Sequence, residues 1–266
     1  NAIQANNQDS AVFHELDVLY SIQGTDINKR LKMFTDNMEV VNQRDDTTYR
    51  YVVCLIQSGD YDKAVDILNT RHFHLFTEVD SELHGAYMNA HQLRGNKFYA
   101  QAKYKEALDD FLAVLKYPDN LEIEITNPLL DEPLCRNYYY IANAYEALGD
   151  AAKAKEFYEK ASQVNVGDTE FGYYKGMAFK KLAQDSHAQA AFDHLIEVAG
   201  TLDTVDFFAK FGQRSQDKAK TAEPYFLKGL AYLGMEKYDQ AKEQLTKAVE
   251  LDGNNVWAAF YLNQLN

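Results

Sequence analysis

The chain has 266 residues, of which 46% are hydrophobic and 25% are charged, a balance typical of a folded protein rather than a disordered one. It carries 27 Lys and Arg against 40 Asp and Glu, and the net charge of −13 argues against nucleic acid as a partner, because phosphate backbones are also negative. No run approaches the roughly 18 apolar residues of a membrane-spanning helix, so no membrane span is predicted.

Two helical hairpins are predicted first, at residues 10–43 and 45–70, and their internal repetition is weak. The second contains the dipeptide Gly59-Asp60, which is typical of a turn where glycine ends one helix before the next begins. The segment 70–84 follows no repeat pattern and is predicted to be an insertion.

The remaining hairpins place small and aromatic residues at fixed positions, as Gly95 and Phe111 do in one and Gly176 and Phe192 in another. Residues three and four apart share one helix face, so the small residues of each first helix are expected on the face that meets the second helix. Their small size allows the second helix to approach closely. In chain order we predict hairpins at 85–117, 134–167, 169–200 and 222–254, insertions at 117–133 and 200–221, and a C-terminal capping helix at 255–265.

The fourth and sixth hairpins match each other best. Their first helices align Tyr138, Ala142 and Tyr145 with Tyr225, Gly229 and Tyr232, and their second helices align Ala154, Tyr158 and Ala161 with Ala241, Leu245 and Ala248. This pattern resembles the tetratricopeptide repeat (TPR). The resemblance implies an all-α fold, a right-handed α-solenoid of about six TPR-like hairpins whose first helices line a concave groove.

The resemblance also assigns groove side chains. Each repeat is numbered so that the first small residue of its first helix, such as Ala142, is position eight. Position five of the successive repeats then holds His14, Tyr49, Gln92, Tyr139, Tyr173 and Phe226, and position nine supplies Asn96 and Asn143. Five of the six position-five side chains are rings, which could grip a peptide or a sugar chain along the groove. The alternative is that these rings pack against adjacent helices or insertions.

A second resemblance covers residues 16–125. It is carried by Arg44, Asp45, Asp46, Arg71, Phe73, His74, Pro118, Asn120 and Leu121. This region resembles the C-terminal repeat region of large bacterial proteins that have a β-rich N-terminal domain of uncharacterised function. The resemblance implies a helper or scaffold segment attached to another domain. After His74, however, the family's usual Trp-Glu-Gly-Gly is replaced by residues 75–78, Leu-Phe-Thr-Glu.

Few residues suggest chemistry. His72, His74 and His84 could be imagined as zinc ligands, but their spacing fits no familiar site, and we predict no metal and no other cofactor. No phosphate loop or nucleophile motif is present, so no enzyme is predicted. The acidic pairs 45–46 and 109–110 are expected on solvated helix faces, and Cys54 and Cys135 are expected to be free and structural.

The sequence therefore predicts a non-catalytic module that binds a protein or peptide, as the C-terminal part of a larger bacterial protein. Residue 1 is Asn rather than Met and no signal-like segment follows, which suggests a piece of a longer chain. The compartment is therefore unknown, with the cytoplasm slightly favoured and an extracytoplasmic location left open. Two alternatives stay open: a structural scaffold or dimerisation arm for the missing domain, and an accessory carbohydrate-associated binding segment. The partner's identity and the oligomeric state are left open.

Overall fold

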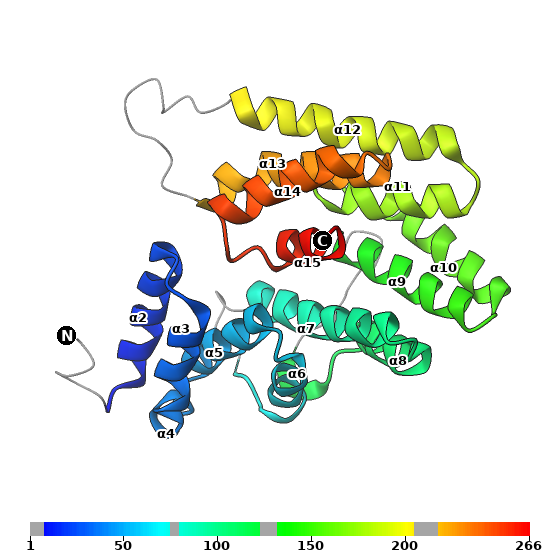
Figure 1. Ribbon diagram of the computed structural model, residues 1–266. Coiled ribbons are helices and arrows are strands. Elements are labelled where there is room, and N and C mark those ends of the chain that lie inside the picture. The colour runs from blue at the N-terminus through cyan, green and yellow to red at the C-terminus, as the bar shows by residue number, and fades with distance from the viewer. Residues whose placement is uncertain (1–7, 75–79, 123–131, 205–217) are drawn as a thin grey trace. The chain divides into compact units, whose positions relative to one another are not determined.

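The computed structural model of the protein describes residues 8–74, 80–122, 132–204 and 218–266. Within these ranges every regular element is a helix, which confirms the all-α prediction (Figure 1). The chain divides into two compact units, Asn1–Glu124 and Ile125–Asn266. Parts of the predicted insertions, residues 75–79, 123–131 and 205–217, lie outside the described residues, and the prediction of one continuous array stays a prediction.

Unit 1 contains the N-terminal hairpins. Its elements are α2 (Ser10–Gln23), α3 (Ile27–Thr35), α4 (Met38–Val41), α5 (Asp45–Ser58), α6 (Tyr61–Thr70), α7 (Asp80–Ala100), α8 (Tyr104–Ala113) and a 3-10 turn η1 (Asp119–Leu121). Helix α5 is the centre of the unit, because α2, α3, α6 and α7 all pack against it. Its side chains are buried over most of its length, among them Tyr51, Val52 and Cys54.

Unit 2 contains three hairpins and a last helix. Its elements are α9 (Pro133–Ala147), α10 (Ala151–Gln163), α11 (Phe171–Lys181), α12 (Asp185–Thr204), α13 (Lys218–Gly234), α14 (Tyr238–Leu251) and α15 (Val256–Gln264). Each hairpin packs its two helices together, and the first helices α9, α11 and α13 also contact one another in sequence order. This is how stacked helical repeats bury apolar faces that no single hairpin could bury alone.

The close approach of paired helices depends on glycine at the predicted small positions. A Cβ added to Gly95 or to Gly176 would lie 2.4 Å from a ring carbon of Phe111 or Phe192, and one added to Gly229 would lie 2.7 Å from Leu245. These distances are far below ordinary carbon–carbon contact. The small residues seen in the sequence therefore let the rings of the second helices seat against the first helices.

The hairpin turns use a left-handed residue in both units. Gly59 and Gly149 end their helices at φ +83°, as the glycine turns predict. The turns of three other hairpins place Ala102, Ala183 and Glu236 at φ between +57° and +62°, where a side chain is unfavourable. The same left-handed turn is thus made by glycine in some hairpins and by alanine or glutamate, at a cost in backbone strain, in others.

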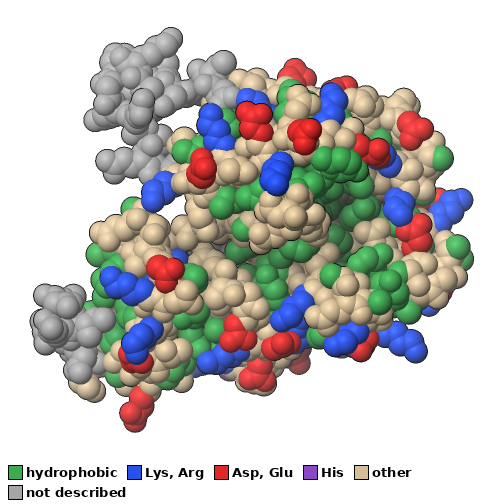
Figure 2. Space-filling view, in the orientation of Figure 1, with side chains coloured by type: hydrophobic (Ala, Val, Ile, Leu, Met, Phe, Trp, Pro, Cys, Tyr) green, Lys and Arg blue, Asp and Glu red, His purple; other side chains and the backbone are tan. Residues whose placement is uncertain are grey.

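The predicted capping helix is α15. The side chain of Asn255 accepts hydrogen bonds from the backbone N–H groups of Trp257 and Ala258, and α15 packs against α14. In the described part of the chain, no helix is both long and apolar enough to cross a membrane. Figure 2 shows acidic and basic side chains interspersed over the face drawn, rather than gathered into one patch.

Candidate functional site

The predicted groove residues are buried or bonded within the chain. Tyr49, Gln92, Tyr139, Tyr173 and Phe226 are each at most 9% exposed. Their burial follows from their place on the first helices, which are covered by neighbouring elements within each unit. Whether these side chains bind a partner stays a prediction.

The two asparagines at position nine are half-buried and make intrachain hydrogen bonds. Asn96 Nδ2 donates to the backbone carbonyl of Gln92 at 2.7 Å, and Asn143 Oδ1 accepts from the hydroxyl of Tyr158 at 2.7 Å. A hydrogen bond between the two helices of one hairpin explains why Asn143 suits this position without a ligand.

In unit 2, α15 covers part of the face formed by α9 and α11. The ring of Trp257 stacks on that of Tyr140 with centroids 6.1 Å apart, and the Arg136 guanidinium lies 3.9 Å from the Trp257 ring centroid. The hydroxyl of Tyr261 donates to that of Tyr174 at 2.8 Å and lies 3.2 Å from that of Tyr140. The sequence predicted a cap on the last hairpin, but not that its rings would reach back to α9.

A pocket of about 370 Å³ remains open beside the start of α15. It is lined by Glu170, Ala219, Lys220, Glu223, Phe226, Asp252, Asn255 and Trp257. These residues come from the N-terminal end of α11, the first turns of α13, the loop between α14 and α15, and the first turn of α15. Phe226 is the one predicted groove residue that lines it, so a groove position and an open pocket coincide here.

The pocket is acidic. Glu170, Glu223 and Asp252 line it, against the single cation Lys220. Burial raises the pKa of Glu170, and the carboxylates of Glu223 and Glu132 raise it further, whereas Arg136 opposes the rise. Sequence reasoning missed these carboxylates, because charged residues at helix starts and in loops carry no distinguishing spacing.

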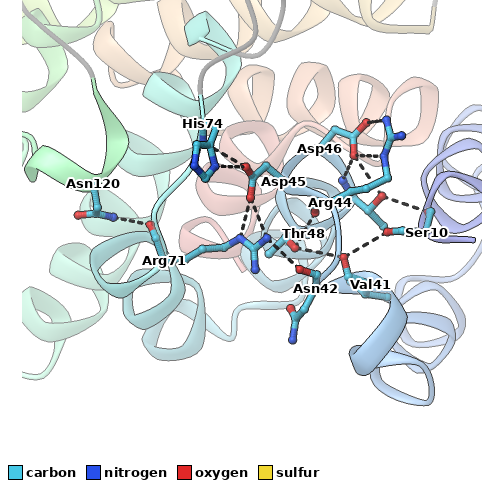
Figure 3. Close-up of polar contacts among 11 residues, drawn as sticks. Ser10, Val41, Asn42, Arg44, Asp45, Asp46, Thr48, Arg71, His74 and Asn120 are labelled. Carbon is cyan, nitrogen blue, oxygen red and sulfur yellow. Dashed lines mark hydrogen bonds and ion pairs between the residues drawn. The ribbon is translucent and has the colours of Figure 1, made fainter.

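A second group of polar contacts in unit 1 is centred on Asp45, in the first turn of α5 (Figure 3). Its carboxylate accepts two hydrogen bonds from the Arg71 guanidinium, at 3.0 and 2.7 Å, and one from the backbone N–H of His74 at 3.1 Å. The His74 Nδ1 also lies 3.1 Å from this carboxylate. The end of α6 and the segment after it are thereby fixed to the start of α5.

Asn120 completes this group from η1. Its side-chain amide donates to the backbone carbonyls of Leu68 and Arg71 at 2.9 and 2.6 Å, and its backbone carbonyl accepts from the N–H of Phe73. Figure 3 places Asn120 and Arg71 side by side, although they lie 49 residues apart. Most residues that carry the second resemblance therefore meet around the end of α6, where they hold two inter-hairpin segments in place.

The three candidate metal ligands have other contacts. His72 Nε2 lies 2.9 Å from a carboxylate oxygen of Glu122, and the rings of His72 and His74 meet edge to face at 4.7 Å. His84 instead stacks on the ring of Tyr117 at 5.0 Å. Among the residues that the structure describes, no group of three or more His, Cys, Asp or Glu side chains could hold a metal ion.

The expectation that the acidic pairs lie on solvated helix faces is wrong for Asp110, whereas Asp45 and Asp46 are half-buried. Asp110 is 3% exposed and accepts hydrogen bonds from the Arg94 guanidinium at 2.9 and 2.6 Å, with His91 Nδ1 at 2.8 Å. Asp45 is held as described above. Both cysteines are free, as predicted, and both are buried.

Comparisons with known proteins agree with the repeat pattern. The family model for the tetratricopeptide repeat matches residues 136–165 and 222–255, so the chain contains such repeats. Among solved structures, the chain is similar to pilF of Pseudomonas aeruginosa, at 15% identity over 96% of this chain and 97% of that one, with a TM-score of 0.39.

Two other solved structures are similar over almost the whole chain. One is YrrB, described as a TPR protein with an unusual peptide-binding site, at 20% identity over 98% of this chain and 95% of that one, with a TM-score of 0.26. The other is the C-terminal part of a TPR repeat-containing protein from Cytophaga hutchinsonii, at 15% identity over 98% and 90% of the two chains, with a TM-score of 0.39.

Proposed function

We propose that this protein is a non-catalytic interaction module that binds a protein or an extended peptide through unit 2. The pocket beside Phe226 carries the proposal, because it is where a predicted groove position meets open space. Tetratricopeptide repeats in general bind proteins or peptides, and two of them lie in this unit. On this proposal Tyr139 and Tyr173 support the binding face from within.

The proposal is tested by selecting peptides from a random displayed library on the immobilised chain and measuring their affinity by fluorescence anisotropy. We expect a selected peptide to bind at least tenfold more weakly to Phe226→Leu, because the pocket loses its aromatic wall. Phe179→Leu is the matched control, since Phe179 lies on α11 against His187 and does not line the pocket.

Both variants must keep the wild-type helical content by circular dichroism. Enrichment of no peptide over a bare support would contradict the proposal, and so would equal loss of binding in the two variants.

A structural scaffold is the second candidate function, and α15 is the observation that favours it. Trp257 and Tyr261 place their rings against Tyr140 and Tyr174, so part of the face is occupied by the chain itself. On this alternative the repeats space or join other domains and need no ligand. Trp257→Ala, which removes the largest ring of α15, tests this alternative. If the face is a covered groove, the variant should gain binding of selected peptides. If the face is only part of the core of a scaffold, we expect no gain in peptide binding.

The wider context of the module is a further part of the proposal. We infer from the resemblance of residues 16–125 that the repeats form the C-terminal part of a larger bacterial protein with a β-rich domain. The contacts of Asp45, Arg71, His74 and Asn120 support a shared structural motif. An antibody against this chain should detect a protein well above 30.4 kDa in extracts of the source cell, and a single intact band at 30.4 kDa would contradict the inference.

A further inference from the structure

We propose that the pocket beside Phe226 and Trp257 binds a basic side chain of the partner, Lys or Arg, with its charged group among Glu170, Glu223 and Asp252. This inference rests on the proposed function and names the chemistry of its ligand. It predicts that the partner contributes a cation at this point.

The charge of the pocket favours a cation. Three carboxylates line it, Lys220 is the single cation among the lining residues, and Arg136 acts on Glu170 from outside the lining. Asp252 is only 8% exposed, and its side chain accepts a hydrogen bond from the backbone N–H of Asn254 at 3.0 Å. Since buried carboxylates are usually ion-paired, an arriving ammonium or guanidinium group would give Asp252 a charged partner.

The two rings favour the same ligand. Aromatic faces attract cations, and the protein already uses Trp257 in this way, because Arg136 lies 3.9 Å from its ring centroid. Phe226 supplies a second ring at the pocket, against which the aliphatic stem of a Lys or Arg side chain can pack. An anionic ligand would gain nothing from these walls and would be repelled by the carboxylates.

The shape of the pocket fits a side chain rather than a folded element. Its volume of about 370 Å³ lies at the small end of ligand pockets. Glu223, Ala219 and Lys220 are exposed, whereas Phe226, Trp257 and Asp252 are buried, so the pocket has an open rim and a closed base. A metal ion is a poorer candidate, because these carboxylates do not form a metal-binding group among the described residues.

Trp257 makes the test direct, because it is the only tryptophan in the chain and it lines the pocket. The full chain is titrated with N-acetyl-arginine amide and N-acetyl-lysine amide while the Trp257 fluorescence is recorded. N-acetyl-citrulline amide, which has nearly the shape of the arginine compound but no charge, is the ligand control. We expect saturable changes with the two cations and at least fivefold weaker binding of the citrulline compound.

Protein variants locate the site. Glu170→Gln and Glu223→Gln each remove one pocket charge and should weaken binding of the arginine compound at least fivefold. Glu243→Gln makes the same chemical change on the exposed face of α14, outside the pocket, and should leave binding unchanged. Equal circular dichroism and an unchanged Trp257 emission maximum establish that the variants are folded.

The proposal is overturned if neither cation gives a saturable change, if citrulline binds as well as arginine, or if Glu243→Gln weakens binding as much as the pocket variants. Its failure is distinguishable from failure of the proposed function. Selected peptides that require Phe226 but contain no Lys or Arg would overturn the cation pocket alone. Saturable binding of arginine without any selected peptide would overturn the peptide-binding function alone.

Discussion

The two units build similar hairpins but stabilise them with different chemistry. Unit 1 buries ions: Asp17, which has no exposed surface, accepts hydrogen bonds from Arg30 at 2.8 and 3.0 Å and from Arg50 at 2.8 Å. Asp110 forms a similar buried group with His91 and Arg94. Such networks are costly to desolvate, and they stabilise a fold only when every partner is in place.

Unit 2 is built around a cluster of buried tyrosine rings. Tyr139, Tyr140, Tyr173, Tyr174 and Tyr261 are all under 10% exposed and contact one another. No ion pair between described residues of this unit has two buried members. The comparison teaches that the hairpin geometry, set by small residues and turns, does not dictate the chemistry of the core. Unit 1 should therefore respond to charge and unit 2 to volume.

Loss of the buried carboxylate should have the largest effect. Asp17→Asn leaves the guanidinium of Arg30, which is 2% exposed, without its counter-charge. We expect the free energy of unfolding of unit 1 to fall by about 3–5 kcal/mol. Urea denaturation followed by circular dichroism reports both units, whereas Trp257 fluorescence reports unit 2 only, so the fluorescence midpoint should move less.

The control for this variant is Asp36→Asn, which breaks the exposed pair with Lys32 and should cost at most about 0.5 kcal/mol. Equal losses in Asp17→Asn and Asp36→Asn would contradict the role assigned to the buried network.

A volume change in unit 2 should have the next largest effect. Gly176→Ala would place a Cβ 2.4 Å from the ring of Phe192, which is 2% exposed and also faces Gly234 on α13. We expect a loss of about 1–3 kcal/mol from this overpacking, measured as a lower midpoint of the Trp257 fluorescence transition.

Two further variants test this explanation. Phe192→Leu should restore part of the loss in the Gly176→Ala background, because it removes the ring that the new Cβ meets. Gly200→Ala, in an open part of α12, should instead stabilise the helix by up to about 1 kcal/mol. Destabilisation by Gly200→Ala of the same size would indicate that the glycine positions are not distinguished by packing.

The sequence predicted the helix packing within the hairpins but not the buried charges of unit 1. The close contacts of Gly95 and Gly176 follow from their repeated positions, because one helix period fixes which residues face the partner helix. The burial of Asp17 and Asp110 was not predicted. Asp17 lies four residues after buried Phe13, on the same face of α2, but its partners Arg30 and Arg50, 13 and 33 residues away, depend on how the helices cross.

The candidate pocket likewise combines a residue that the repeat pattern predicted with residues that it did not. Phe226 was predicted from its repeat position, whereas Glu170 and Asp252 come from separate loops and helix ends that no periodicity relates. The path of α15 decides which face of unit 2 is covered. That path depends on the rings of Trp257 and Tyr261 finding Tyr140 and Tyr174, a tertiary match that local sequence does not specify.

Acid should affect unit 1 through Asp45. Burial opposes its charged form, but the hydrogen bonds from His74 and Arg71 outweigh this, and its pKa lies below the ordinary 3.8. A lowered pKa stabilises the folded state above the unfolded-state pKa, and this stability is lost as the pH falls through the folded-state pKa. Asp45→Asn should therefore cost about 1–2 kcal/mol at pH 7 and progressively less below about pH 4. Urea midpoints at several pH values measure this, and a constant difference from pH 7 to pH 3 would contradict it.

The smallest effect should come from the hairpin turns, which are common to both units. Ala183 adopts φ +57° between α11 and α12, and Ala102 adopts φ +58° at the matching place in unit 1. A left-handed conformation costs an alanine roughly 1–2 kcal/mol, whereas glycine adopts it freely but loses roughly 0.5–1 kcal/mol more chain entropy on folding. The difference favours glycine, so Ala183→Gly should raise the free energy of unfolding by about 0.5 kcal/mol.

Two further variants test this explanation of the turns. Gly149→Ala, at φ +83° in the turn between α9 and α10, should lower the free energy of unfolding by about 1 kcal/mol. If Ala102→Gly stabilises unit 1 as much as Ala183→Gly stabilises unit 2, the turns contribute equally to both, and the difference between the units resides in their cores. A loss of stability in either alanine-to-glycine variant would show instead that the left-handed alanine makes contacts worth more than its strain.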